Sequence, residues 1–121
     1  PNGRIEPVPR NGAWLKRHEE FVDIARKGGN DVVFLGDSIT DYWRRSDPTK
    51  GGRTVWENYF APMHAANFGI ASDRTQHVLW RIQHGELDGP APQVVVVLIG
   101  TNNTGLESDK HTPRNSPQET A

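Results

Sequence analysis

Two short polar turns, each directly after an apolar run, hold the residues of this chain best suited to chemistry. The first turn follows residues 32–35 and contains Ser38, which offers a hydroxyl group. The second follows residues 94–99 and contains Asn102, which offers a side-chain amide. A serine hydroxyl becomes a nucleophile when a base takes its proton and nearby N–H groups hold the oxyanion that forms. The two turns therefore offer a nucleophile and an oxyanion donor.

The apolar runs also predict the elements that position these turns. Continuous β-branched sequence is typical of strands that are buried on both faces of a parallel sheet. Expected strands alternate with expected helices, the strands lying at 31–35, 65–68 and 94–99 and the helices at 13–27, 55–60 and 73–85. This alternation predicts a doubly wound, flavodoxin-like α/β fold with helices on both faces of a parallel sheet. Ligands bind beyond the carboxyl ends of such strands, where both turns lie.

Two local expectations concern the segments around the turns. In the helix expected over 73–85, Val78, Leu79 and Ile82 are predicted to share the apolar face. The polar segment 42–54 is expected to be a loop near the site.

Composition limits the cofactors and partners. The 14 basic and 15 acidic side chains give a formal net charge of −1, which argues against binding of nucleic acid or an anionic membrane by bulk charge. No stretch approaches the roughly 20 apolar residues of a membrane span. The absence of cysteine excludes disulfides and thiolate metal sites. The sequence shows no His-Glu-x-x-His pattern and no dinucleotide or phosphate-loop fingerprint, so we expect neither metal nor cofactor.

We expect a single domain over residues 1–121, with an extended arm at 1–10 and a polar tail at 104–121. Within the tail, residues 116–119 read Ser-Pro-Gln-Glu, which is a helix start signal. The valine-rich run at 94–99 would be an aggregation hazard at the edge of a sheet. Both features favour a chain that is cut short after its third strand. A start at Pro1 fits either a removed leader or trimming, and leaves open a cytoplasmic or an exported protein.

Each motif alone has an ordinary structural explanation. A serine in Gly-Asp-Ser is commonly a helix N-cap or a turn residue, and an asparagine after a strand commonly satisfies its own backbone. The combination is more specific, because a third block, 67–73, follows the second expected strand. In this order, the blocks 36–38, 67–73 and 100–103 resemble those of the SGNH (GDSL-type) hydrolases.

The resemblance covers roughly residues 14–103 and is closest to the branch of platelet-activating-factor acetylhydrolase catalytic subunits and bacterial carbohydrate acetylesterases. It implies that Ser38 is the nucleophile and that the Ser38 N–H and the Asn102 amide hold the oxyanion. A third donor is implied to be the N–H of Ser72, where the family usually has glycine. A left-handed backbone there would strain a serine. Further pocket residues are expected from the neighbouring positions, namely Asp37, Trp43, Arg74 and Asn103.

The chain departs from the family in lacking its C-terminal Asp-x-x-His block. Four of the five histidines, His18, His64, His77 and His84, are expected to lie away from the carboxyl edge, and His111 falls in the polar tail. None is assigned as the catalytic base, so the base and its orienting acid are expected from residues outside this sequence.

These features predict an esterase that removes short acyl groups, above all acetyl, from a small-molecule or carbohydrate ester through an acyl-serine intermediate. This chain alone is expected to be inactive. A non-catalytic SGNH-like binding or assembly module is the alternative, and a flavodoxin-like nucleotide or phosphate binder rests on fold alone. Partners left open are a second copy of the chain and a further C-terminal segment.

Overall fold

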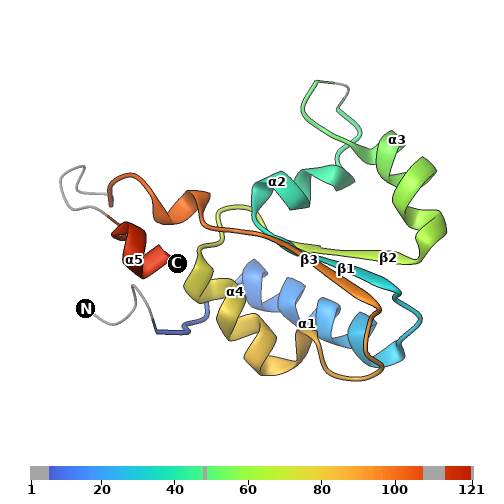
Figure 1. Ribbon diagram of the computed structural model, residues 1–121, viewed down its shortest axis with the longest axis horizontal. Coiled ribbons are helices and arrows are strands. Elements are labelled where there is room, and N and C mark those ends of the chain that lie inside the picture. Colours follow the sequence, from blue (N-terminus) through green and yellow to red (C-terminus); the bar gives the residue numbers. More distant parts are fainter. Residues whose placement is uncertain (1–5, 48, 108–113, 121) are drawn as a thin grey trace.

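A three-stranded parallel sheet forms the centre of the protein (Figure 1). The computed structural model describes residues 6–47, 49–107 and 114–120. The strands are β1 (Val32–Gly36), β2 (Ala65–Gly69) and β3 (Val94–Leu98), in the order β2-β1-β3. Gly36 lies beside Gly69 and Leu98 in the register, so the three strands end together. The predicted parallel α/β sheet is confirmed, and the turns after all three strands lie at one edge.

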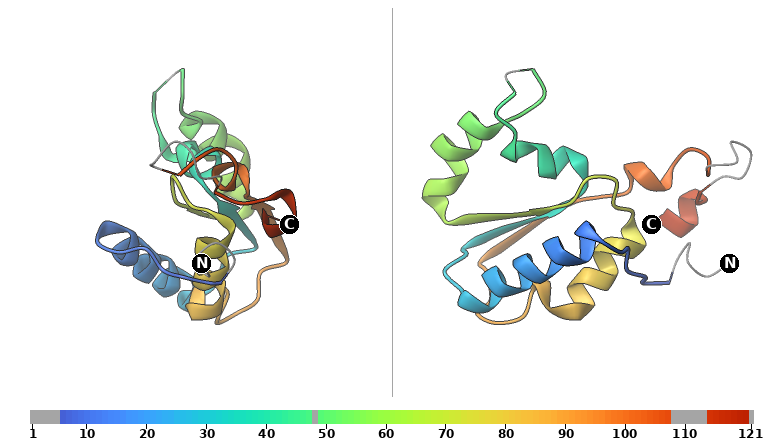
Figure 2. Two further views of the ribbon diagram at one scale, coloured as in Figure 1. Left: turned by 90° about the vertical axis from the view of Figure 1, so that its left-hand side faces the viewer. Right: turned by 180° about the vertical axis from the view of Figure 1, so that it is seen from behind.

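Helices cover both faces of the sheet, as predicted (Figures 1 and 2). On one face lie α1 (Ala13–Lys27) and α4 (Thr75–Arg81), which continues as η5 (Ile82–Glu86). On the other lie α2 (Ser38–Asp41), η2 (Tyr42–Arg44), α3 (Arg53–Val55), η3 (Trp56–Phe60) and η4 (Ala61–Met63). The remaining helical segments are η6 (Thr101–Asn103) and α5 (Pro117–Thr120).

Alternation along β1 explains the two layers, because successive side chains point to opposite faces. Val33 and Leu35 are buried in the core beneath α1 and α4. Phe34 points to the other face and contacts the rings of Trp56 and Phe60 edge-on, with ring centroids 5.2 Å apart in both pairs. The expected loop over 42–54 contains η2 and the first two residues of α3, because the helical segment begins at Arg53, directly after Gly52, and not at residue 55 as predicted.

The first helix has its predicted bounds. Its apolar positions Trp14, Phe21 and Ala25 are buried, and Phe21 stacks on Phe68 of β2 with ring centroids 4.9 Å apart. The helix ends at Lys27, and the φ of 73° at the following Gly28 suits glycine. It is 15 residues long, and none of the helices in the described ranges is long and apolar enough to span a membrane.

The apolar face of α4 differs from the prediction. Val78 is buried as expected, but Leu79 is 42% exposed, and Arg81 is completely buried in its place. The reason is that the Arg81 guanidinium finds backbone carbonyls and two carboxylates between α4 and the sheet. An arginine with this many partners can be buried at a position that a hydropathy pattern assigns to solvent.

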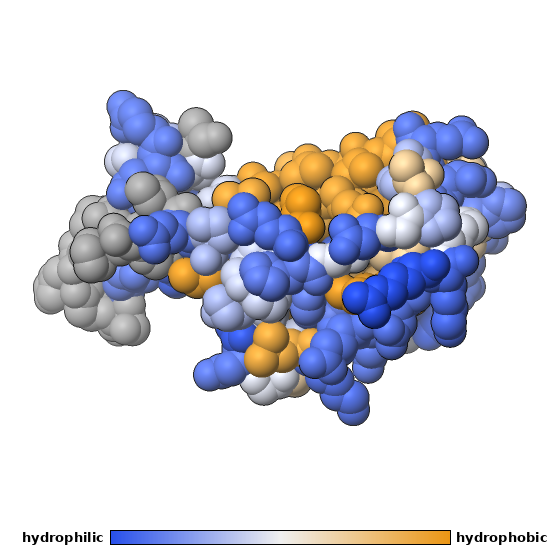
Figure 3. Space-filling model, turned by 90° about the horizontal axis from the view of Figure 1, so that it is seen from below, coloured by the Kyte–Doolittle hydropathy of each residue, from blue (hydrophilic) through white to orange (hydrophobic). Residues whose placement is uncertain are grey.

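The third strand is also less buried than its sequence predicts. The side chains of residues 94–98 are all between 39% and 53% exposed, so neither face of β3 is covered. The strand pairs with β1 alone within the described residues, and helices lie over its neighbours instead. Figure 3 shows the resulting apolar surface as a band along one side of the molecule.

The helix start in the tail is confirmed. Ser116 Oγ accepts the Glu119 N–H at 3.1 Å, and a Glu119 carboxylate oxygen accepts the Ser116 N–H at 2.8 Å. This reciprocal pair is a capping box at the start of α5.

Candidate active site

Ser38 is the first residue of α2 and lies two residues after the last residue of β1. Asp37 precedes it, is fully buried, and accepts the Ile39 N–H at 2.9 Å through one carboxylate oxygen. A side chain at Gly36 would collide with Thr40 and the Leu98 backbone, so the turn requires glycine there. The Ser38 N–H has no hydrogen-bond acceptor among the residues that the structure describes.

The turn after β2 puts Ser72 in a left-handed conformation, with φ of 71°. Both neighbours of Ser72 are held, because Arg10 donates to the Ala71 carbonyl at 3.0 Å and to Asp73 at 2.9 Å. Ser72 itself is exposed, and its N–H has no acceptor within the described ranges. The strain expected for a serine at this position is therefore present.

The turn after β3 is tied to the Ser72 turn. The Asn102 amide nitrogen donates to the Asp73 carbonyl at 2.9 Å. An amide nitrogen carries two hydrogens, and this bond fixes the direction of the second one. The backbone carbonyl of Asn102 accepts from Arg114 at 2.9 Å. The structure thus brings together Asn102 and Ser72, which lie 30 residues apart in the sequence.

Asp41, one helical turn after Ser38, ties the Ser38 helix to the Ser72 turn. Its carboxylate accepts the Ala71 N–H at 2.9 Å and bonds from Arg17 at 3.1 and 3.2 Å, and it also contacts Arg44. Burial alone would raise the pKa of Asp41, but the hydrogen bonds from Arg17 and the Ala71 N–H lower it. The carboxylate therefore stays charged and holds the two turns together.

A buried network of ion pairs supports the same edge from the face of the sheet that α1 and α4 cover. Arg81 donates to the carbonyls of Gly36 and Phe68 and to the carboxylates of Asp73 and Glu86. His18 of α1 bonds to the second Glu86 oxygen at 2.7 Å. Burial raises the pKa of both acids, although Arg81 opposes this. Sequence reasoning missed Arg81, because no pattern distinguishes it from a surface arginine of an amphipathic helix.

The four expected pocket residues have different surroundings. Arg74 lines an open, mostly polar pocket with Ser72 and Asn102, whose other lining residues are Arg10, Gln76, His77 and Arg114. Trp43 lines a separate groove beside Trp56. Asp37 and Asn103 are fully buried, so each contacts other protein groups. A substrate-contacting role for these residues stays a prediction.

Asn103 links the β3 turn to the start of α4. Its side-chain oxygen accepts the Thr75 N–H at 2.8 Å, while its amide nitrogen donates to Thr75, Gln76 and Asn115. These bonds satisfy a buried amide completely, which makes it a support for the turn.

His77 lies closer to the carboxyl edge than the sequence suggests, since it lines the pocket that contains Ser72 and Asn102. Burial, helped by the charges of Arg10, Arg74 and Arg81, lowers its pKa to about 4. The Arg74 N–H donates to its Nδ1 at 2.9 Å, so the proton of the neutral ring is on Nε2. A ring with this tautomer donates at Nε2 and cannot accept a proton there. His111 lies outside the described residues.

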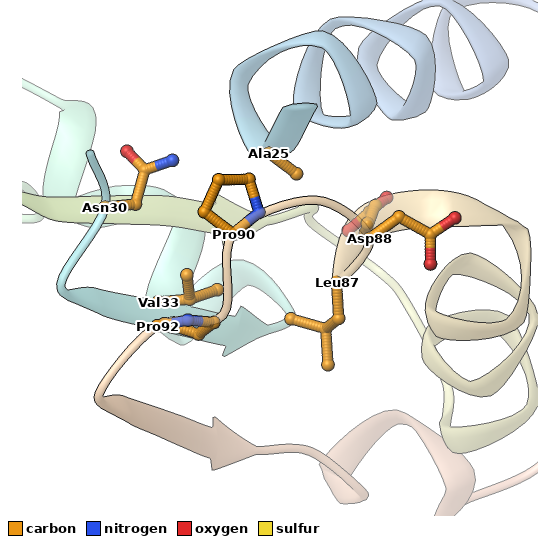
Figure 4. A pocket seen from close by; sticks show the side chains of 8 residues that line it. Ala25, Asn30, Val33, Leu87, Asp88, Pro90 and Pro92 are labelled. Carbon is orange, nitrogen blue, oxygen red and sulfur yellow. The ribbon is translucent and has the colours of Figure 1, made fainter. Parts of the chain in front are cut away.

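Another hollow lies at the opposite end of the sheet (Figure 4). It is formed between the end of α1, the start of β1 and the segment 87–92, with Ala25, Val33 and Leu87 among its lining residues. It is remote from the turns after the strands. In the described part of the chain, no group of three or more His, Asp or Glu side chains is arranged to hold a metal ion.

The fold and the three turns agree with the sequence comparisons. Residues 34–118 match the GDSL-like lipase/acylhydrolase family, and the chain belongs to this family of ester hydrolases.

The individual relatives include subunits of platelet-activating factor acetylhydrolase IB. The chain is 39% identical over 108 residues to platelet-activating factor acetylhydrolase IB subunit alpha1 of Bos taurus and of Homo sapiens, which covers 89% of this chain and 44% of each relative. It is 39% identical over 98 residues to subunit alpha2 of Rattus norvegicus, which covers 81% of this chain and 40% of that protein. The chain therefore spans less than half the length of these relatives.

Proposed function

We propose that the protein is a serine esterase that hydrolyses short-chain esters, above all acetyl esters, with Ser38 as the nucleophile. One observation carries the proposal. The Ser38 N–H, the Ser72 N–H and the second amide hydrogen of Asn102 come from three turns at one end of the sheet, and none has an acceptor among the described residues. Unused donors gathered at one edge are what an oxyanion hole requires.

The reaction would proceed in two steps. The Ser38 oxygen attacks the acyl carbon, its proton passes to a base, and the carbonyl oxygen becomes an oxyanion held by the three donors. The carbon–oxygen bond to the alcohol breaks as the base returns the proton to the leaving oxygen. Water then attacks the acyl-serine in the same way and releases the acid.

The base is proposed to be a histidine oriented by an aspartate, supplied by residues outside 1–121. Three observations support this. His77, which lines the pocket, has the wrong tautomer for a base. One oxygen of the buried Asp37 carboxylate has no partner among the described residues, and both faces of β3 are uncovered. A following segment that covers β3 and brings further donors to the turn would account for the last two.

Labelling by a fluorophosphonate probe tests the nucleophile, because the probe reacts only with an activated serine. We expect the protein at its natural length to be labelled at Ser38 and the Ser38→Ala variant to remain unlabelled. A folded natural-length protein that stays unlabelled would favour the alternative, a non-catalytic binding or assembly module.

The missing base is tested on the 121-residue chain alone. We expect it to hydrolyse p-nitrophenyl acetate no faster than its Ser38→Ala variant does. Rapid hydrolysis that depends on Ser38 would mean that the chain contains its own base.

A further inference from the structure

We propose that the pocket beside Ser72 and Asn102 is a subsite for an acidic group, a carboxylate or phosphate carried by the ester substrate and held by Arg74, Arg10 and His77. The link to an ester rests on the proposed function, whereas binding of the acidic group does not.

The lining of this pocket is rich in hydrogen-bond donors. It contains three arginines, one neutral histidine, two amides and Ser72. The Gln76 side-chain oxygen already accepts bonds from Asn103 and Thr75, so this residue also has only its amide hydrogens to offer. The pocket has a volume of about 500 Å³, which is room for a carboxylate or phosphate and part of its carrier. Such a lining suits a ligand that is rich in acceptors.

Two of the arginines keep donors that no other described residue uses. Arg10 uses Nη1 for the Ala71 carbonyl and for Asp73, which leaves its Nε and Nη2 hydrogens. Arg74 uses Nη2 for Glu107 at 3.0 Å, which leaves Nε and Nη1. A guanidinium holds carboxylate and phosphate oxygens well because its N–H groups form a planar fork.

His77 adds a donor that carries no charge. Its Nδ1 accepts the Arg74 N–H, so the hydrogen on Nε2 is what the ring can offer to a ligand. No partner for Nε2 is present among the described residues. A neutral imidazole next to two arginines can donate to an anion without adding a third positive charge, which the two arginines would repel.

The local charge is positive. Among the described residues, two carboxylates lie near the pocket, Asp73 and Glu107. Asp73 is also paired with the buried Arg81 at 3.0 Å, so its charge is compensated from below. Glu107 alone faces Arg74 and Arg114, at 3.0 and 3.7 Å. Glu107 thus competes with an acidic ligand for Arg74. Loss of Arg74 should therefore weaken binding of the ligand, and loss of the Glu107 charge should strengthen it.

Binding of inorganic phosphate to the natural-length protein provides the first test, followed through the His77 ring signals in NMR titrations. We expect Arg74→Gln to weaken binding about tenfold or more, because a charge-assisted bond is lost. Glu107→Gln should strengthen binding, since it removes the competitor. Arg26→Gln, an exposed arginine at the far end of α1, is the matched control and should change nothing. Equal weakening in the Arg26 and Arg74 variants, or no saturable response, would overturn the proposal.

A pair of esters provides the second test and distinguishes the source of the acidic group. We expect kcat/KM for 4-acetoxybenzoate to exceed that for the uncharged 4-acetoxybenzamide, and Arg74→Gln to remove the difference. Phosphate binding that depends on Arg74 without labelling of Ser38 would support the subsite while rejecting the esterase. If Ser38 is labelled but neither phosphate nor the carboxylate of the ester binds in a way that depends on Arg74, the esterase is supported and the subsite is rejected.

Discussion

The side-chain amide of Asn102 donates a hydrogen bond to the backbone carbonyl of Asp73 over 2.9 Å, and this bond joins the turn after β3 to the turn after β2. The same amide retains one hydrogen for a ligand, and the neighbouring Ser72 N–H has no acceptor in the described ranges. Asn102 therefore has two roles, one in the architecture of the edge and one in the proposed oxyanion hole.

Asn102→Ala should lower kcat of the natural-length protein by ~10²–10³, the usual cost of losing one oxyanion donor. It should change the free energy of unfolding little, since the Asp73 carbonyl lies at a partly buried edge where water can replace the amide. Ester hydrolysis and urea unfolding measure the two effects. Near-normal hydrolysis would contradict the role of Asn102 in the oxyanion hole.

Asn103→Ala should have the opposite effect, lowering the free energy of unfolding more than it affects kcat. This fully buried side chain donates to the side-chain oxygen of the buried Gln76 and also accepts the Thr75 N–H, so its removal takes a partner from both groups. We expect a loss of roughly 1–3 kcal/mol in the free energy of unfolding, the cost of leaving buried polar groups unsatisfied. Urea unfolding of both asparagine variants in parallel is the measurement, and equal stability of the two would refute the distinction.

Ser72→Gly should stabilise the protein by about 1 kcal/mol, because glycine adopts a φ of 71° without the strain that a side chain imposes. Its N–H is kept, so activity should survive. Ser72→Ala should leave the stability near that of the wild type, since the strain lies in the backbone. His64→Gly is a control at another left-handed position, with φ of 56°, far from the site. Destabilisation by Ser72→Gly would show that the serine hydroxyl outweighs the strain.

His77 should make stability depend on pH between about 4 and 6.5. Its pKa of about 4 in the folded protein lies below the ordinary value of 6.5, so the unfolded chain binds more protons in this range. Stability contributed by the neutral ring is full above pH 6.5 and is lost as pH falls toward 4, by up to roughly 3 kcal/mol. Burial raises the pKa of Asp73 and Glu86, which acts in the opposite direction.

The difference between the wild type and His77→Gln isolates the histidine contribution. The pH dependence of urea unfolding should be weaker in the variant over this range. An NMR titration midpoint for His77 near its ordinary value would contradict the structure.

Arg81→Met should destabilise the protein by about 3–5 kcal/mol, because Asp73 and Glu86 would remain buried without their cation. The loss should be smaller at low pH, where protonation removes the uncompensated charges. Arg26→Met is the exposed control. Unfolding measured at neutral and acidic pH tests this, and a loss that is independent of pH would point to packing as its cause.

Sequence patterns predicted the elements well where a single physical cause dominates. The helix over 13–27 has its predicted bounds because its apolar spacing and the glycine after it agree. The turns after the strands were placed correctly because parallel strands end at one edge, and the capping box at Ser116 is a local interaction between near neighbours.

The residue patterns were sufficient to predict the parallel α/β fold, the family, and the polar turns that follow its strands. Which side chains support those turns became clear from the folded chain. Arg81 replaces Leu79 in the interior because carbonyls and carboxylates from distant segments converge on it, and His77 reaches the pocket because α4 starts at the carboxyl edge. The periodicity of a sequence predicts which face of a helix or strand is apolar. Burial of a charge and the tautomer of a ring depend on partners from elsewhere in the chain, and therefore appear only once the chain has folded.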